Sequence, residues 1–343
     1  MRRPGALALL AAVVLPALAS AANPAIVERR LALMGTTLAL SVEAADRAVA
    51  LAASERAVAA LEAAEARLST WRDDSELARL NRAPVGVPFA LSPTLAAELA
   101  AARQCWQSTG GAFDPTVGPL VAAWGLRNGG HLPSAAELQE ARAATGMDGL
   151  ALLSGAAIRL RPGVAVEEGG FGKGAGLAAA VAALSAFAAF AGRGASAATL
   201  DLGGQLALFG PGLRQVAVAD PRLRDRPVVT LAIDRGSVAT SGNSERGIEI
   251  AGRRYGHLLD PRTGRPAADF GSLTVWAGDA LSADCLSKLY VLGPDRAVAW
   301  AATHPGVEVL ALVPSGKGLR ALASRGLAGR LTAVTPDVQI EFP

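Results

Sequence analysis

The stretch Thr109-Gly-Gly-Ala-Phe-Asp-Pro-Thr-Val-Gly-Pro-Leu-Val-Ala-Ala-Trp-Gly125 is the most informative part of this chain. It contains four glycines and two prolines, and Asp114 is its only ionisable side chain. Glycine lets the backbone approach a neighbour closely and proline fixes φ, so this composition favours a shaped loop. A second such stretch, Tyr255-Gly-His-Leu-Leu-Asp-Pro-Arg-Thr-Gly-Arg-Pro266, lies far downstream. Two Asp-Pro turns, one beside a histidine, indicate a built site, the alternative being two tight turns between strands.

The composition of the chain predicts a folded protein with a sizeable core. The chain has 343 residues, of which 51% are hydrophobic and 18% are charged, and this is far from the composition of a disordered chain. The net charge of +3 is small for this length, and no basic run is interleaved with aromatic residues. Nucleic acid is therefore not expected among the partners of this protein.

The N-terminus has the pattern of an export signal. Arg2 and Arg3 precede an uncharged apolar run at positions 6–15, and small residues follow up to Ala21. We predict that residues 1–21 form a signal peptide that is removed, because the apolar run is too short for a comfortable membrane anchor. The mature protein is then expected to be exported and periplasmic, without a stable transmembrane segment.

The hydrophobic patterns favour a single α+β domain over residues 22–343. A strand pair is expected around Met34, and strands dominate after Thr199. The Ala-rich run that ends at Gly192 favours a buried helix over a membrane span, since alanine contributes little hydrophobicity. Helices are also predicted over residues 44–67, 75–81, 93–109, 134–144, 280–292 and 295–303, and a strand over 151–160.

The Gly-rich stretch 166–176 allows two interpretations. Backbone N–H groups that enter a helix there could bind an anion, and Lys173 would add positive charge. The alternative is an ordinary Gly-rich helix entry with a solvent-facing lysine. Gly174 follows Lys173, so the P-loop pattern is not met. Glu167 and Glu168 argue against a purely anion-binding loop and could bind ligand hydroxyls or ring nitrogens, or cap the helix.

Three further groups of residues could carry chemistry. His257 could act as a general base, because its pKa lies near working pH, or it could be structural in its turn. Asp284 could bind Mg²⁺ or pair with Lys288, since the two lie four positions apart on one helix face. Cys105 and Cys285 could form a disulfide in an oxidising compartment or remain two buried thiols.

Short motifs recur along the chain in a definite order and spacing. They are Met34-Gly-Thr36, Ser69-Thr-Trp71 with Ser75-Glu-Leu and Asn81, Gly111-Ala-Phe-Asp-Pro-Thr116 through Trp124-Gly, Gly169-Gly-Phe-Gly-Lys-Gly174, Leu202-Gly-Gly204, Thr240-Ser-Gly242, His257-Leu-Leu-Asp-Pro-Arg-Thr-Gly264 and Ala283-Asp-Cys-Leu-Ser287. Together these motifs resemble those of the ApbE family, the FAD:protein FMN transferases, over about residues 30–315.

The resemblance implies an exported flavin transferase with a T-fold-type α+β fold, in which helices flank mixed or antiparallel sheets. Such an enzyme transfers the FMN moiety of FAD to a Thr or Ser hydroxyl of a redox protein and releases AMP. In this chain His257 would deprotonate the acceptor hydroxyl. The implied flavin-site residues are Met34, Trp71, Ala112, Phe113, Asp114, Glu167, Lys173 and Leu259. The implied Mg²⁺ ligands are Gly170, Asp284 and Ser287.

Three positions depart from the pattern of the family. Glu167 stands where the family usually has Asp, and Ala178 stands where an Asp follows the Lys-Gly motif. Lys288 stands where Thr or a related oxygen ligand is usual, so its ammonium could occupy the metal position and weaken transfer. Two alternatives therefore stay open. One is a periplasmic FAD-binding accessory or maturation flavoprotein with little transferase activity, such as those associated with nitrous-oxide respiration. The other is FAD hydrolysis, in which water replaces the acceptor hydroxyl.

Overall fold

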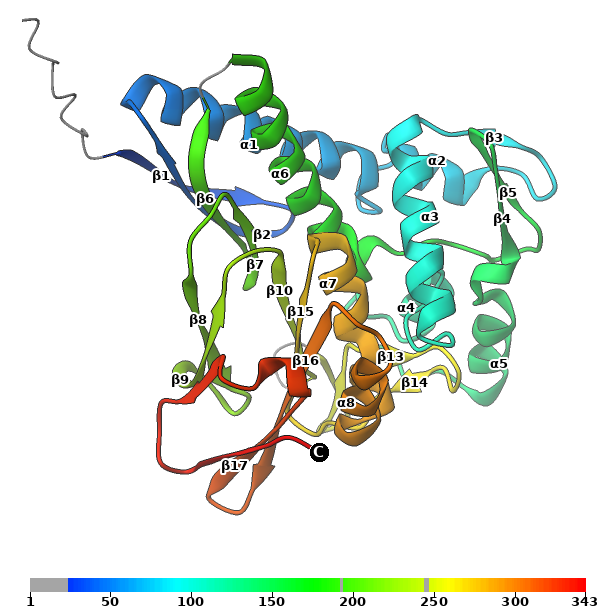
Figure 1. Cartoon of the computed structure of the whole chain (residues 1–343). Helices are drawn as coiled ribbons and strands as arrows, with labels where there is room; N and C mark the ends of the chain where they lie inside the picture. The colour runs from blue at the N-terminus through cyan, green and yellow to red at the C-terminus, as the bar shows by residue number, and fades with distance from the viewer. Residues whose placement is uncertain (1–23, 192–193, 244–246) are drawn as a thin grey trace, which may run out of the picture.

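The computed structural model describes residues 24–191, 194–243 and 247–343 (Figure 1). The predicted signal peptide, residues 1–21, lies outside the described residues. The framework is a nine-stranded sheet whose neighbouring strands run antiparallel except for the last pair, which is parallel. In spatial order its strands are β1 (Ala25–Leu33), β2 (Thr36–Ala44), β6 (Ala195–Leu202), β7 (Gln205–Phe209), β10 (Ser237–Ser241), β15 (Ser272–Ala277), β16 (Val307–Ser315), β17 (Gly318–Ala323) and β19 (Val338–Glu341).

Four helices cover one face of this sheet. They are α1 (Arg47–Leu68), α6 (Gly172–Ala191), α7 (Ala280–Leu286) and α8 (Pro294–Ala302). Alternate residues of β2, Leu38, Leu40 and Val42, are buried against α1 and α6, because strand side chains point to opposite faces in turn. This packing confirms the α+β class expected from the sequence.

The opposite face of the sheet packs, around β16 and β17, on a smaller three-stranded sheet. Its strands in spatial order are β18 (Leu331–Ala333), β9 (Leu223–Ile233) and β8 (Arg214–Asp220). Along β16, Val309 and Ala311 face α8, whereas Leu310 and Leu312 face the smaller sheet. The strand is therefore apolar on both sides, as expected for a strand between two layers.

A second group of elements lies beside α6 and α7, at the right in Figure 1. It contains α2 (Glu76–Arg82), α3 (Pro93–Ser108), α4 (Gly118–Ala123), α5 (Ala135–Ala144) and the small sheet β3 (Phe89–Ala90), β5 (Ala156–Arg159) and β4 (Leu150–Leu153). Serines cap the predicted starts of α2, α3 and α5, since Ser75, Ser92 and Ser134 each accept from a backbone N–H of the first turn. One apolar cluster joins α3 to α6 and α7 through Leu99 and Leu281.

Helix α6 is the Ala-rich run singled out in the sequence. Among the described residues it is the one helix whose length and apolar composition would suit a membrane crossing, with a mean hydropathy of 1.4 over Gly172–Ala189. Leu177, Ala180 and Leu184 are buried in the cluster that α6 shares with α1 and β2. The opposite side of α6 is exposed and carries the polar residue Ser185. We therefore interpret α6 as a helix that packs on the sheet and not as a membrane span.

Some elements differ from the sequence predictions. The stretch 151–160 was predicted as one strand, but it belongs to the hairpin β4–β5, because Gly155 turns the chain at a φ of +70°. The stretch 280–292 is α7 followed by the 3₁₀ helix η3 (Ser287–Leu292). The short 3₁₀ helices η1 (Met147–Gly149), η2 (Glu168–Gly170) and η4 (Arg325–Leu327) complete the helical elements of the described chain.

Candidate active site

The Gly-rich loop 109–125 is fixed from inside by Asp114. Its buried carboxylate accepts from Thr116 N at 2.8 Å, Thr116 Oγ1 at 2.5 Å and Met147 N at 3.2 Å. Burial raises the pKa of Asp114, while the hydrogen bonds from Thr116 and Met147 act in the opposite direction. Ala112 and Phe113 are 2% exposed, so at these two predicted flavin positions mainly the backbone remains to meet a ligand.

Met34 lies over the first turns of α6. It adopts a left-handed φ of +50°, and its N–H donates to Glu65 Oε1 at 3.0 Å. A Cβ placed on Gly176 would lie 3.0 Å from Met34 Sδ. Left-handed backbone at a residue other than glycine stores strain, and such strain is enriched at ligand sites. The structure thus brings the predicted residue Met34 to the same helix end as the Gly-rich stretch.

Arg127 joins Trp71 to the two glutamates that precede α6. Its guanidinium lies over the Trp71 ring, with Cζ 4.5 Å from the ring centroid. Its Nη2 donates to both carboxylate oxygens of Glu167, at 2.6 and 2.5 Å, and lies 3.7 Å from Glu168 Oε2. The Trp71 side chain is 68% exposed, so one face of an aromatic ring is held in place and open to a planar ligand.

One arginine therefore serves two neighbouring carboxylates. Burial, and then the charge of Glu168, raise the pKa of Glu167 to about 7, against the lowering effect of Arg127. Glu168 also accepts from Thr70 Oγ1, which in turn accepts from Arg127. Near neutral pH the Glu167 carboxyl next to the start of α6 therefore changes its charge.

Asp284 on α7 faces the start of α6. Its Oδ2 accepts from Gly174 N at 2.9 Å and its Oδ1 accepts from Lys288 Nζ at 2.7 Å. Although burial disfavours the ionised form, the charges of Lys288 and Lys173 hold the pKa of Asp284 below its ordinary value. The carboxylate is therefore ionised, and it anchors positive charge where α6 begins.

Gly174 allows the two helices to come this close. A Cβ placed on it would lie 2.3 Å from Ala280 O and 2.7 Å from Asp284 Cβ, and real Cβ atoms do not approach other atoms so closely. The glycine is required here because the backbone of α6 lies directly against α7.

The residues implied as Mg²⁺ ligands gather around Lys288. Its Nζ donates to Asp284 Oδ1 and also lies 3.0 Å from Asp284 O and 3.2 Å from Ser287 Oγ. A Cβ placed on Gly170 would lie 3.8 Å from Lys288 Cε. The described part of the chain holds no group of three or more His, Cys, Asp or Glu residues suited to a metal ion. The arrangement fits an ammonium and does not fit a divalent cation alongside it.

His257 lies in the loop between β12 (Arg253–Gly256) and β13 (Leu259–Asp260) and is half-buried. Asn243 fixes this loop, since its Oδ1 accepts from Leu258 N and its Nδ2 donates to Ala267 O, both at 2.8 Å. Two residues before Asn243, Ser241 shares a 2.7 Å hydrogen bond with Ser287. The end of β10 therefore links the histidine loop to the cluster around Asp284.

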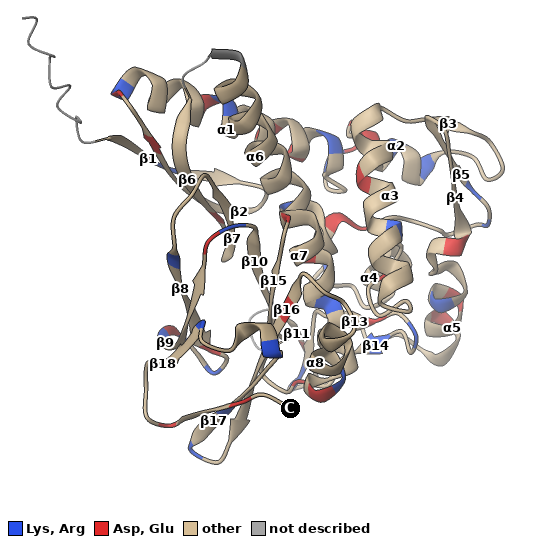
Figure 2. Ribbon diagram, in the orientation of Figure 1, with Lys and Arg blue, Asp and Glu red and all other residues tan. Residues whose placement is uncertain are grey.

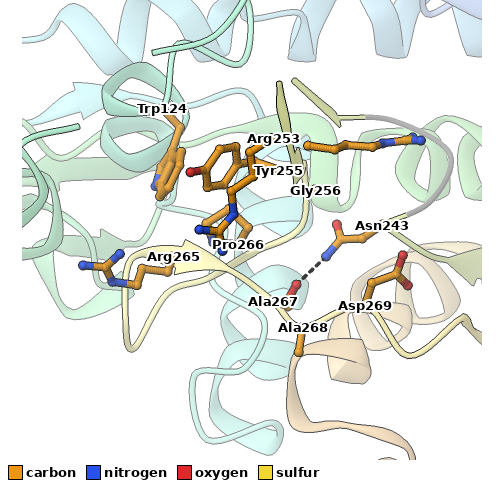
Figure 3. Close-up of a pocket in the computed structure, with 11 residues that line it drawn as sticks. Trp124, Asn243, Arg253, Tyr255, Gly256, Arg265, Pro266, Ala267, Ala268 and Asp269 are labelled. Atoms are coloured by element: carbon orange, nitrogen blue, oxygen red, sulfur yellow. Dashed lines mark hydrogen bonds between the residues drawn. The ribbon is translucent and has the colours of Figure 1, made fainter. Parts of the chain in front are cut away.

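A groove of about 430 Å³ opens beside this loop (Figure 3). Its walls come mainly from β12, from β14 (Arg265–Pro266) and from residues 267–269. Strand β12 pairs with β11 (Gly247–Ile250), and β14 pairs with β13. Trp124 and Tyr255 lie together with ring centroids 5.3 Å apart. Three arginines and one acidic residue also line the groove, namely Arg253, Arg254, Arg265 and Asp269. The groove reaches Gly256, which directly precedes His257.

Leu259, predicted as a flavin residue, is buried in an apolar cluster with Leu120 and Trp124. Figure 2 shows basic and acidic residues intermixed along the ribbon, whereas three arginines and one acidic residue line the groove. Sequence reasoning missed Arg127 and Asn243, because both act through partners far away in the chain. The only sequence signal for Arg127 was a charged residue three positions after Trp124 in a Gly-rich loop.

Comparisons with known proteins give the family of this chain. Residues 34–311 match the model of the ApbE family. The FAD:protein FMN transferase of Salmonella typhimurium is 30% identical over 301 residues, which are 84% of each chain. The protein of the same name from Vibrio cholerae is 32% identical over 275 residues, covering 77% of this chain and 80% of the relative.

Solved structures of similar proteins have the same fold. The crystal structure of the ApbE protein from Thermotoga maritima matches with a TM-score of 0.74 and 28% identity, over 83% of this chain and 94% of that one. The flavin transferase ApbE from Vibrio cholerae matches with a TM-score of 0.71 and 27% identity, over 90% and 99% of the two chains. The mixed sheet with flanking helices is thus shared with these proteins.

Proposed function

The chain belongs to the ApbE family, and from this premise we propose that it is an FAD:protein FMN transferase that modifies a Thr or Ser hydroxyl of an exported redox protein. The observation that supports this most is the meeting of two cationic side chains at the start of α6. Lys173 and Lys288 both act on Asp284 there, and FAD carries its negative charge on the pyrophosphate that must be cleaved. Positive charge fixed at this point favours binding and cleavage of a pyrophosphate.

The reaction uses few groups of the chain. The acceptor hydroxyl loses its proton to His257, and its oxygen attacks the phosphorus on the FMN side of the pyrophosphate. The bond from that phosphorus to the AMP oxygen breaks, so that AMP leaves and FMN becomes a phosphate ester of the acceptor. Asn243 orients the loop that carries His257, since it binds the neighbouring N–H of Leu258.

The flavin itself is held by the residues on the other side of α6. The open face of the Trp71 ring offers stacking area to the isoalloxazine, and Arg127 keeps that ring in place. Met34 and the backbone of residues 112–114 complete this side, as the resemblance implies. The pKa of Glu167 is raised to about 7, so its carboxyl group can donate or accept a hydrogen bond at a polar edge of the ring system.

The acceptor protein is expected to enter through the groove beside His257. Its arginines suit a segment that carries acidic residues, and its aromatic pair suits an apolar contact. The predicted signal peptide supports an exported location for the enzyme and its partner. This location also makes a redox protein at the outer face of the membrane a plausible acceptor.

In-gel fluorescence tests this function. The mature chain, residues 22–343, is incubated with FAD and an acceptor domain that the Vibrio cholerae flavin transferase modifies, and the denatured acceptor is examined for covalent flavin. A fluorescent acceptor band is expected, and an acceptor variant with valine in place of the modified Thr should stay dark. No labelling, under conditions in which the Vibrio cholerae enzyme labels the same acceptor, would argue against transfer.

The same experiment separates the two alternatives. The position of Lys288 favours a flavin-binding accessory protein as the second candidate, because the ammonium stands where a metal ligand was expected. In that case the protein binds FAD tightly and labels nothing. Release of free FMN and AMP without an acceptor would instead indicate hydrolysis of FAD.

A further inference from the structure

We propose that the ammonium of Lys288 serves as a built-in cation in place of a divalent metal, so that this chain transfers FMN without bound Mg²⁺. The proposal has two parts. The first part, that Lys288 excludes the metal, concerns the folded protein alone. The second part, that the ammonium supports FMN transfer, rests on the proposed function. The two parts are therefore tested by separate measurements.

The ammonium of Lys288 has its full set of partners. A lysine ammonium has three N–H donors, and Nζ has three oxygen neighbours at 2.7, 3.0 and 3.2 Å, which belong to Asp284 and Ser287. The side chains of Lys288 and Asp284 are 15% and 2% exposed. The lysine is thus held by its helix neighbours and is largely shielded from water, unlike a surface lysine.

Both oxygens of the Asp284 carboxylate are already engaged. Oδ1 accepts from Lys288, and Oδ2 accepts from the N–H of Gly174. Mg²⁺ requires oxygen ligands at about 2.0–2.1 Å in a near-octahedral arrangement. A metal ion at Oδ1 would lie beside the ammonium, and like charges repel strongly where water is scarce.

Among the described residues, the two glutamates nearest in sequence to Gly170 are already paired. Glu167 and Glu168 precede Gly170 in the chain, but both are engaged by Arg127. Lys173 adds a second positive charge that acts on Asp284. Asp284 therefore already lies in the field of two ammonium groups, and a divalent cation at its Oδ1 would lie beside that of Lys288.

The ammonium can provide what the reaction requires. Negative charge develops on the leaving phosphate oxygens when the pyrophosphate is cleaved, and a cation fixed beforehand stabilises it without reorganisation. Lys288 lies next to Gly170 and Phe113, since a Cβ placed on Gly170 would contact both side chains, at 3.8 and 3.1 Å. The charge thus borders the loop that the resemblance assigns to FAD.

The first part is tested by titrating the mature protein with Mn²⁺ and following the free ion by electron paramagnetic resonance. Wild-type protein should bind no Mn²⁺ tightly. The variant Lys288→Thr, which restores an oxygen ligand and removes the charge, should bind on the order of 10- to 100-fold more tightly than wild type. The matched control Lys317→Thr, on the exposed turn between β16 and β17, should behave as wild type.

The second part is tested by FMN transfer in EDTA or in Mg²⁺. The wild-type rate should be equal in both, whereas Lys288→Thr should lose on the order of 100-fold in EDTA and recover in Mg²⁺. Lys288→Met should bind FAD and stay inactive in both, because it supplies neither charge nor ligand. Circular dichroism and FAD titration establish that each variant is folded and binds flavin.

Each outcome decides one part of the proposal. Stoichiometric Mn²⁺ binding by the wild-type protein overturns the exclusion of metal, and so does a wild-type rate that EDTA abolishes. A wild-type protein that binds FAD but transfers nothing in either buffer contradicts the proposed transferase function, and the catalytic role of the ammonium falls with it, whereas an unchanged rate of Lys288→Thr in EDTA overturns that role alone. A protein that binds no FAD contradicts the proposed function itself, while the Mn²⁺ titration, which needs neither FAD nor acceptor, still decides whether Lys288 excludes the metal.

Discussion

Arg127 binds Glu167 across forty residues of sequence, with Nη2 2.6 and 2.5 Å from the two carboxylate oxygens. The same guanidinium covers the Trp71 ring and lies near Glu168. One cation therefore organises an exposed aromatic face and a pair of acids at the entrance of α6. This arrangement makes the charge of Glu167 depend on pH in the range where enzymes work.

The first prediction concerns pH. The pKa of Glu167 is raised to about 7 in the folded protein from an ordinary value of 4.5. Its ionisation therefore destabilises the fold; this cost is absent below about pH 4.5, grows as pH rises towards 7 and is constant above. From pH 4.5 to 8 the unfolding free energy of Glu167→Gln should gain about 1–3 kcal/mol relative to wild type.

Urea unfolding at several pH values measures this difference. The control is Glu137→Gln, because hydrogen bonds from Ser134 and His131 lower the pKa of Glu137 to about 2. Its contribution is fully present above an ordinary pKa of 4.5, so its difference from wild type should stay constant over the tested range. A constant difference for Glu167→Gln as well would contradict the raised pKa.

The second prediction concerns the loop anchor Asp114. Asp114→Ala leaves the buried N–H groups of Thr116 and Met147 without their acceptor, so we expect a loss of about 2–4 kcal/mol in unfolding free energy and weaker FAD binding. The matched control is Asp148→Ala, whose exposed pair with Arg161 is worth at most about 1 kcal/mol. Equal losses in the two variants would show that Asp114 does not hold the loop.

The third prediction concerns His257. His257→Asn should lower the rate of FMN transfer by about 10²- to 10⁴-fold, because a general base contributes that much. FAD affinity, measured by quenching of flavin fluorescence, should stay within twofold of wild type. His131→Asn, at an exposed histidine that pairs with Glu137, should transfer at the wild-type rate. A fully active His257→Asn variant would remove the histidine from the mechanism.

The fourth prediction concerns the groove beside the histidine loop. Arg265→Ala should raise the KM for the acceptor protein, on the order of tenfold at low salt, and the effect should shrink as ionic strength rises. The kcat and the affinity for FAD should not change. Arg320→Ala removes a surface pair with Glu341 on β17 and β19 and should leave the acceptor KM unaltered. A changed FAD affinity with an unchanged acceptor KM would place FAD, not the acceptor, in the groove.

The fifth prediction concerns the two cysteines. Cys105 and Cys285 are buried free thiols in one apolar cluster. Burial, and then a hydrogen bond with Cys105, raise the pKa of Cys285 well above its ordinary value. Neither thiol should react with Ellman's reagent in the native protein, because both are buried and the thiolate of Cys285 is suppressed. Two equivalents should react in denaturant, and none at all there would reveal a disulfide instead.

Local signals in the sequence were enough for most of the elements. Pro93 predicted the start of α3, and the Met34-Gly-Thr36 motif predicted the turn between β1 and β2. Strands were expected in general after Thr199, but no local pattern predicted β17 itself, because its burial depends on β16 and on the parallel strand β19. Helix α4 was missed because its six residues lie inside a loop rich in glycine and proline.

In the candidate site, too, local spacing predicted some contacts, whereas packing alone creates the others. Asp284 and Lys288 could be paired from their spacing of four on one helix, and the structure confirms that contact. The pairing of Arg127 with Glu167 could not be predicted, because these residues are forty positions apart and only tertiary packing brings them together. The same holds for Asn243, whose partners become neighbours only when β10 ends beside the histidine loop.

Because α6 lies directly against α7 at Gly174, substitutions in the core can affect catalysis as well as packing. Since α6 covers the large sheet and also presents a backbone donor to Asp284, any enlarged side chain that pushes α6 off α7 also removes the Gly174 N–H from the carboxylate that holds Lys288. Inactive variants are therefore expected among residues that never meet flavin. Such variants would remain folded and soluble, so a screen for thermal stability would not detect their loss of activity.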